Sequence, residues 1–285
     1  MRLIDRINQF VLLFIDTVKQ FGLWRAWGLL LGYFLLNWLL LYSHYEFASP
    51  IFYSVSSFWM NLLSHVVPGY GPDQVAAFSH YPQHLLFLGD VFGWTKLIVG
   101  VIVEGLVLGG VAYLFGQRFV PNPPAGDRSF VVTWVNLVIV WLALNLFTVA
   151  AGLLLPQWFE PLLNGPRRVL AFSFVGMPLV FTLIFALFVY ALPSVIVNRE
   201  NAVKAVLRSL KMAVTRPFTS FFLAFAILLI PLFLGTLSGR PADIIDKFRP
   251  DLIYWLLVAG LAAEMIANFF WMGTAVRFLS ESEER

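Results

Sequence analysis

Cysteine is absent from this chain of 285 residues, and charged side chains are scarce. The lack of cysteine excludes disulfides, thiolate metal sites and cysteine nucleophiles. Only 12% of the residues are charged and 60% are hydrophobic, with a mean hydropathy of +0.81. A water-soluble domain of this length cannot leave such a composition on its surface. The composition therefore predicts an integral membrane protein.

Catalytic and nucleotide-binding motifs are also missing. The chain has no Walker-type glycine loop, no dinucleotide fingerprint, no Gly-x-Ser-x-Gly elbow and no His-Glu-x-x-His helix. Its formal charge is only +3, and the basic residues are spread over several loops instead of forming a stripe, which argues against nucleic acid as a partner. We therefore favour a non-enzymatic protein without a cofactor, although an intramembrane enzyme acting on lipid is not excluded by motifs alone.

Long apolar runs recur along the chain, each bounded by polar, Pro or Gly residues. A helix needs about 20 residues to cross the hydrocarbon core, and each run reaches that length. The six expected spans are residues 23–43, 92–116, 130–155, 169–197, 218–238 and 252–279. We predict an all-α bundle of about six transmembrane helices that forms a single membrane domain over residues 1–285.

The distribution of Lys and Arg predicts the orientation of this bundle. If both termini lie inside, 13 of the 19 basic residues lie on the inner side and six on the outer side. The connection 44–90 carries no Lys or Arg and belongs outside. Positively charged loops are retained in the cytoplasm, so we expect cytoplasmic N- and C-termini in a bacterial-type inner membrane.

Three segments outside the spans have helical patterns of their own. Residues 1–21 alternate polar and apolar positions, which predicts an amphipathic interfacial helix. The outer loop 44–90 contains an expected interfacial helix, with Ser49 as its cap and Pro50 in its first turn, and a second short helix from Asp73 to Phe78. Residues 199–216 form a basic elbow on the inner side, whose expected contacts with anionic lipid are Lys204, Arg208 and Lys211; a partner-docking helix is the alternative.

The elbow carries a resemblance to a known group of proteins. The stretch Ala191-Leu192-Pro193-Ser194-Val195-Ile196-Val197 is followed by Ala202, Ala205 and Leu207-Arg208-Ser209-Leu210, and Phe218, Phe221 and Phe222 open the next span. This pattern resembles the polytopic membrane domain associated with glycerophosphodiester phosphodiesterases and its stand-alone relatives. The likeness covers residues 190–235 and brings no catalytic residue with it. It implies a six-span bundle, and it carries no hydrolase activity over to this chain.

Two carboxyl groups are expected near the middle of spans. Glu104 lies in the second span and Glu264 in the sixth, where an ionised side chain costs several kcal/mol unless it is paired, hydrated or protonated. Asn145 and Asn268 lie close enough to mid-span to complete an oxygen-rich site with them. Since Lys96 lies about two turns outward from Glu104, we expect no basic residue at that depth. A neutral carboxyl that is hydrogen-bonded to a neighbouring helix is the favoured interpretation, and a shared proton or cation site is the alternative.

Three prolines, Pro178, Pro193 and Pro231, are expected to bend spans four and five. Such breaks are used by transporters, but passive bundles contain them too.

All four histidines fall in the outer loop. A candidate zinc or copper site there consists of His65, His80, His84 and Asp90. Because Pro82 separates His80 from His84, these two do not form a regular helical pair. Histidines that only donate and accept hydrogen bonds at the interface are the favoured interpretation.

Three functional hypotheses follow. The first is a subunit or scaffold of a membrane assembly or of envelope maintenance, with lipid and other membrane subunits or further copies of the chain as partners. The second is a proton- or cation-coupled small-solute transporter that uses Glu104 and Glu264. The third is an outer-face metal-binding protein.

Overall fold

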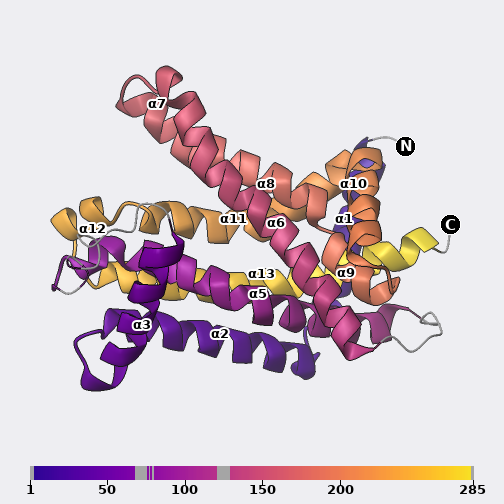
Figure 1. The fold of residues 1–285 in the computed structure, drawn as a ribbon. Helices are drawn as coiled ribbons and strands as arrows, with labels where there is room; N and C mark the ends of the chain where they lie inside the picture. Colours follow the sequence, from indigo (N-terminus) through magenta and orange to yellow (C-terminus); the bar gives the residue numbers. More distant parts are fainter. Residues whose placement is uncertain (1–2, 68–75, 77, 79, 121–128, 284–285) are drawn as a thin grey trace. The chain divides into compact units, whose positions relative to one another are not determined.

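The computed structural model describes residues 3–67, 76, 78, 80–120 and 129–283, and every regular element within these ranges is a helix (Figure 1). Six of the helical segments are long and apolar enough to cross a membrane: 24–45, 84–119, 130–162, 166–197, 217–238 and 252–281. The predicted all-α membrane bundle is confirmed. The second span begins eight residues earlier than the sequence pattern indicated, because α5 runs without a break from His84 to Phe119.

The contacts divide the chain into two compact units. Unit 1 comprises residues 1–31, 101–229 and 265–285, and unit 2 comprises residues 32–100 and 230–264. Four helices contribute residues to both units, namely α2 (Trp24–Tyr45), α5, α11 (Pro217–Ser238) and α13 (Leu252–Glu283).

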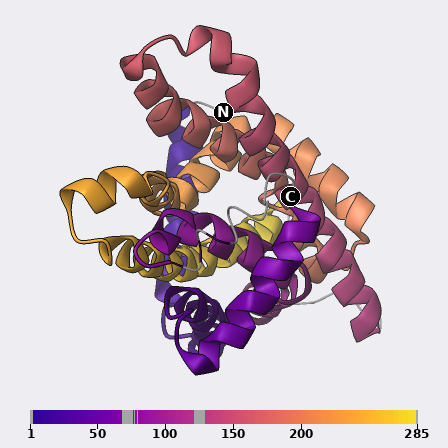
Figure 2. The same cartoon turned by 60° about the vertical axis from the view of Figure 1, so that its left-hand side comes forward.

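Unit 1 contains the third and fourth spans. The third is α6 (Phe130–Phe159), extended by a short 3₁₀ turn, and the fourth consists of α7 (Pro166–Ala171), a π-helical turn (Phe172–Gly176), α8 (Met177–Phe188) and α9 (Ala191–Val197). Figures 1 and 2 show α6 and α8 in contact, with α7 at the turn between them. Aliphatic and aromatic side chains fill the core of this unit, among them Leu108, Phe115, Leu137 and Phe269.

The fourth span is interrupted where prolines remove backbone donors. The π-helical turn ends just before Pro178, and the helix breaks again at Val189 and Tyr190, four residues before Pro193. Proline has no N–H for the carbonyl four positions earlier, and its ring crowds that carbonyl. The carbonyl of Val189 instead accepts a hydrogen bond from the indole Nε1 of Trp271, at 2.8 Å. The expected bend in span four is therefore a break sealed by another helix.

A serine on the elbow helix α10 (Ala202–Thr215) closes the same break. The Ser209 hydroxyl donates to the carbonyl of Leu187 at 2.7 Å and accepts from the backbone N–H of Tyr190 at 3.2 Å. Ser209 and Tyr190 are both fully buried. Because water is absent from the membrane interior, a broken helix persists only where protein groups satisfy its backbone. Ser209 thus fixes the elbow helix to span four.

Replacing Ser209 with Ala is expected to lower the free energy of unfolding by about 1–3 kcal/mol, since the Tyr190 N–H and the Leu187 carbonyl lose their shared partner. Chemical unfolding in mixed micelles measures the change. The matched control is Ser238→Ala, because the Ser238 hydroxyl is exposed and bonds only within its own helix. Equal effects of the two substitutions would contradict this role for Ser209.

The N-terminal helix α1 (Leu3–Lys19) packs on the C-terminal half of α13 within unit 1. Leu13 and Thr17 are fully buried, and Phe14 stacks on Phe270 with ring centroids 4.8 Å apart. The two helices approach most closely at Gly273, where an added Cβ would collide with the Thr17 methyl and lie 2.9 Å from the Phe115 ring. The opposite side of α1 exposes apolar side chains, including Leu12 and Ile15. The predicted helix exists, and its placement at an interface stays a prediction.

Unit 2 is built from the C-terminal parts of α2 and α11 and the N-terminal parts of α5 and α13, together with α3 (Pro50–Val66) and α12 (Pro241–Lys247). Its core includes Leu41, Leu85, Leu88 and Ile253. As expected, Pro50 opens α3, but the Ser49 side chain makes no capping hydrogen bond, which corrects that detail. The buried face of α3 carries Ser56, Met60 and Leu63, while the apolar residues Ile51, Val55 and Phe58 are exposed. The second short helix, 73–78, falls almost wholly outside the described residues.

Candidate functional site

An ion pair lies between two of the spans in unit 2. The Lys96 ammonium on α5 contacts the Glu264 carboxylate on α13, and the side chains are only 20% and 31% exposed. Seven residues earlier on both helices, a Cβ on Gly89 would lie 4.0 Å from Leu257. Since seven residues make two helical turns, α5 and α13 run side by side in parallel here. This packing brings Lys96 to Glu264.

The ion pair is deep along both helices. Lys96 and Glu264 are each twelve residues from the first residue of their helix, which corresponds to about 18 Å at the α-helical rise per residue. Leu97 follows Lys96, and Ala263 and Met265 flank Glu264. The expectation that no basic residue reaches the depth of Glu264 is wrong. The position of Lys96 along α5 relative to Glu104 does not give its depth relative to Glu264, because neighbouring helices are not aligned by their mid-points.

A hydrogen-bonded histidine joins three helices of unit 2. His44 on α2 is fully buried; its Nδ1 lies 3.2 Å from the Ser56 hydroxyl of α3 and its Nε2 lies 3.1 Å from the Thr95 hydroxyl of α5. Thr95 donates its own proton to the carbonyl of Val91 at 2.8 Å, so it accepts from Nε2–H. His44 thereby positions the turn of α5 that carries Lys96.

The four residues predicted to form one intramembrane site are divided between the units. Glu264 belongs to unit 2, whereas Glu104, Asn145 and Asn268 belong to unit 1. Asn145 donates to the carbonyl of Trp141 on its own helix at 3.0 Å, and Asn268 is buried. A common site for all four residues stays a prediction, while the partner found for Glu264 is Lys96.

The candidate outer-face metal ligands have other surroundings. His65 Nδ1 lies 2.7 Å from the carbonyl of Asn61, and His80 Nδ1 lies 3.0 Å from that of Ala76. His84 is buried among the rings of Tyr45, Phe47, Phe78 and Tyr81, and Asp90 is exposed on α5. Among the described residues, no three His, Asp or Glu side chains are grouped as a metal would require. A zinc or copper site stays a prediction.

Two of the three predicted lipid contacts on the elbow helix α10 are exposed lysines. Arg208 pairs with Glu200 at 2.8 Å, whereas Lys204 and Lys211 are exposed. Val203, Leu207 and Val214 are also exposed and follow helical spacing next to these lysines. Contact with anionic lipid therefore stays a prediction that falls mainly on Lys204 and Lys211.

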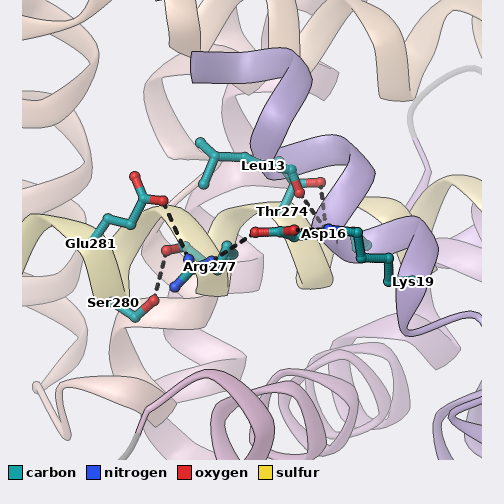
Figure 3. A network of polar contacts seen from close by, with 8 residues as sticks. Leu13, Asp16, Lys19, Thr274, Arg277, Ser280 and Glu281 are labelled. Carbon is teal, nitrogen blue, oxygen red and sulfur yellow. Dashed lines mark hydrogen bonds and ion pairs between the residues drawn. The ribbon is translucent and has the colours of Figure 1, made fainter. Parts of the chain in front are cut away.

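A polar network fixes α1 to α13 (Figure 3). Asp16 pairs with Lys19 at 2.9 Å and with Arg277 at 3.3 Å, and Arg277 also reaches Glu281 at 3.5 Å. The Thr17 and Thr274 hydroxyls are 3.2 Å apart. The hydrogen bond from Lys19, together with the charges of Lys19 and Arg277, lowers the pKa of Asp16 below its usual value.

This lowered pKa predicts acid sensitivity of the helix contact. A carboxyl whose pKa is lower in the folded state contributes stability above its unfolded pKa, and this contribution is lost as the pH falls through the folded pKa. We expect hydrogen exchange in α1, corrected for the intrinsic exchange rates, to accelerate when the pH is lowered from about 5 to about 3. Asp16→Asn should remove that dependence, and Asp243→Asn, in an exposed pair with Lys247, should not. If Asp16→Asn keeps the pH dependence of the wild type, Asp16 is not the cause of the acid sensitivity.

Six apolar helices and an embedded ion pair define the class: a multi-pass α-helical membrane protein. Beyond that class, no family model, curated protein or solved structure matches the chain. The resemblance of residues 190–235 to the phosphodiesterase-associated membrane domain stays a prediction.

Proposed function

We propose that the protein is a proton- or cation-coupled carrier of small solutes, in which the Glu264 carboxylate exchanges Lys96 for the coupling ion. One observation carries this proposal: the partly buried ion pair between α5 and α13. Ionisable residues within spans are costly, and those that persist commonly mark ion or substrate pathways. The geometry favours Glu264 paired with Lys96 over the initially expected pairing of Glu264 with Glu104.

The exchange has a simple electrostatic basis. While paired, Lys96 and Glu264 present no net charge to the membrane interior. A proton or cation that binds Glu264 displaces the ammonium, and the released ammonium must then find water or an anionic solute. Binding of the ion is thereby linked to a rearrangement between α5 and α13. A carrier needs such a link between ion binding and helix movement.

Transient currents test this proposal without knowledge of the solute. Proteoliposomes on a solid-supported membrane receive jumps in proton or sodium concentration, and charge entering an embedded site gives a saturable transient current. We expect this current in the wild type and in the control Asp243→Asn, which removes an exposed carboxylate from α12. We expect no such current in Glu264→Gln. No transient in the wild type, or an unchanged one in Glu264→Gln, would contradict the proposal.

A subunit of a membrane assembly is the second candidate, and the surface of α6 favours it. Large apolar side chains of α6 are exposed along its length, for example Val135 at 45%, Leu146 at 69% and Trp158 at 68%. Either lipid or another protein covers such a surface. Native mass spectrometry of the protein released with its surrounding lipid distinguishes the two: a stoichiometric protein partner favours the assembly, and a lone chain favours the carrier.

We further propose that both termini face the cytoplasm of a bacterial-type inner membrane, on the basis of 13 inner against five outer basic residues once the embedded Lys96 is left out. The chain has no native cysteine, so single cysteines report topology cleanly. In intact spheroplasts, a membrane-impermeant maleimide should label Asn61→Cys on α3, and it should label Lys211→Cys on α10 only after permeabilisation. The reverse pattern would invert the proposed orientation.

A further inference from the structure

A cationic cavity lies in unit 1, where the first turn of α2 meets the last turns of α5. Its volume is about 490 Å³, and it is lined by Gly22, Leu23, Trp24, Arg25, Leu114, Gln117 and Arg118. Arg25 and Arg118 are exposed, and Trp24 is 80% exposed. Two arginines, an amide and an indole therefore surround one opening.

The backbone beside this cavity is held in place by its own contacts. The indole Nε1 of Trp27 donates to the carbonyl of Phe21 at 2.9 Å, closing the connection between α1 and α2. The Trp27 ring stacks on Phe269 with centroids 4.4 Å apart. Consecutive backbone hydrogen bonds tighten residues 20–24 further. Gly22 to Arg25 are thus presented by a tightly bonded turn, and little ordering is needed when a ligand binds.

The cavity has an excess of positive charge. No carboxylate is among its lining residues, and the nearby Asp16 is engaged by Lys19 and Arg277. Arginine guanidinium groups suit bidentate contacts with phosphate oxygens. The N-terminus of α2, a helix of 22 residues, adds the positive end of its dipole.

We propose that this cavity binds the phosphate group of an anionic phospholipid. The cavity lies at the ends of two spans, since α2 begins at Trp24 and α5 ends at Phe119, and span ends are at headgroup depth. Arg25 and Arg118 hold the phosphate, Gln117 donates to its oxygens or to the headgroup, and Trp24 lies at the interface where tryptophan is favoured. This inference does not depend on the carrier proposal.

Lipid retention in native mass spectrometry tests the inference. The full-length protein in detergent is mixed with phosphatidylglycerol or with phosphatidylcholine of the same acyl chains. Arg25→Gln/Arg118→Gln removes both cavity charges. Arg167→Gln/Arg168→Gln is the matched control, since it removes two exposed arginines from α7, also in unit 1. Melting temperatures of all variants verify that they are folded.

We expect the wild type and the α7 control to retain one phosphatidylglycerol in preference to phosphatidylcholine. The cavity variant should lose at least about tenfold in this retention, because charge-assisted hydrogen bonds are lost. Excess inorganic phosphate identifies where the bound phosphate group comes from. If inorganic phosphate does not compete, the ligand is the lipid. If it binds alone and displaces the lipid, the lipid assignment is overturned in favour of a soluble phosphate. Equal retention by the cavity variant and the wild type, or equal losses in both double variants, overturns the inference.

Discussion

Lys96→Met is expected to destabilise the protein by about 2–4 kcal/mol, less than the about 3–5 kcal/mol lost when a fully buried ion pair is broken, because this pair is partly exposed. The loss arises because the substitution leaves the Glu264 carboxylate without its ammonium inside the span. The carboxylate must then take up a proton or draw in water. Reversible unfolding in mixed micelles, with dodecyl sulfate as the denaturant, measures the change.

The double variant Lys96→Met/Glu264→Gln separates the two parts of this effect. Replacing both partners removes the uncompensated charge, and buried ion pairs exchanged for uncharged residues are often close to neutral in stability. We therefore expect the double variant to recover most of the lost stability while showing no transient current. If Lys96→Met is as stable as the wild type, the two side chains do not form an embedded pair.

Gly273→Ala should detach α1 from α13. Its new methyl group would collide with Thr17 and lie 2.9 Å from the Phe115 ring, and both neighbours are fully buried. In a free helix the substitution would gain about 1 kcal/mol of helix propensity, but overpacking costs about 1–3 kcal/mol. We expect a net loss of stability, together with faster hydrogen exchange throughout α1.

Gly260→Ala is the matched control on the same helix. A Cβ at Gly260 meets nothing within 4 Å, so this change should leave stability unchanged or raise it slightly. Opposite signs for the two substitutions are the expected result. A stabilising Gly273→Ala would mean that α1 does not pack where the structure places it.

The spans could be predicted because hydrocarbon thickness sets the length of an apolar run, and the runs at 130–155 and 218–238 fall within the long helices. The ion pair between Lys96 and Glu264 could not be predicted from the sequence. Its formation depends on how far α5 is offset along α13, and α5 begins at His84 although its continuous apolar run begins near residue 92. Hydropathy reports how apolar a run is, but not which residue of a neighbouring helix lies opposite.

The break in span four shows the same division between what the sequence predicts and what it does not. Pro193 predicts that the carbonyl of Val189 lacks its usual donor, which can be inferred from one residue type. The donor, Trp271, is 82 positions away in the chain, and Ser209 is on a separate helix. Nothing in the local pattern distinguishes Ser209 from an ordinary polar residue of an amphipathic helix.

The Glu264 carboxylate is paired with Lys96 within the span. Infrared spectra of protein labelled with ¹³C at the glutamate side-chain carboxyls, in lipid nanodiscs at neutral pH, test this pairing directly by difference between the wild type and Glu264→Gln. We expect the substitution to remove a carboxylate band, and we expect this band to give way to a protonated-acid band in Lys96→Met. If the substitution instead removes a protonated-acid band, Glu264 is neutral in the wild type and the ion pair does not exist.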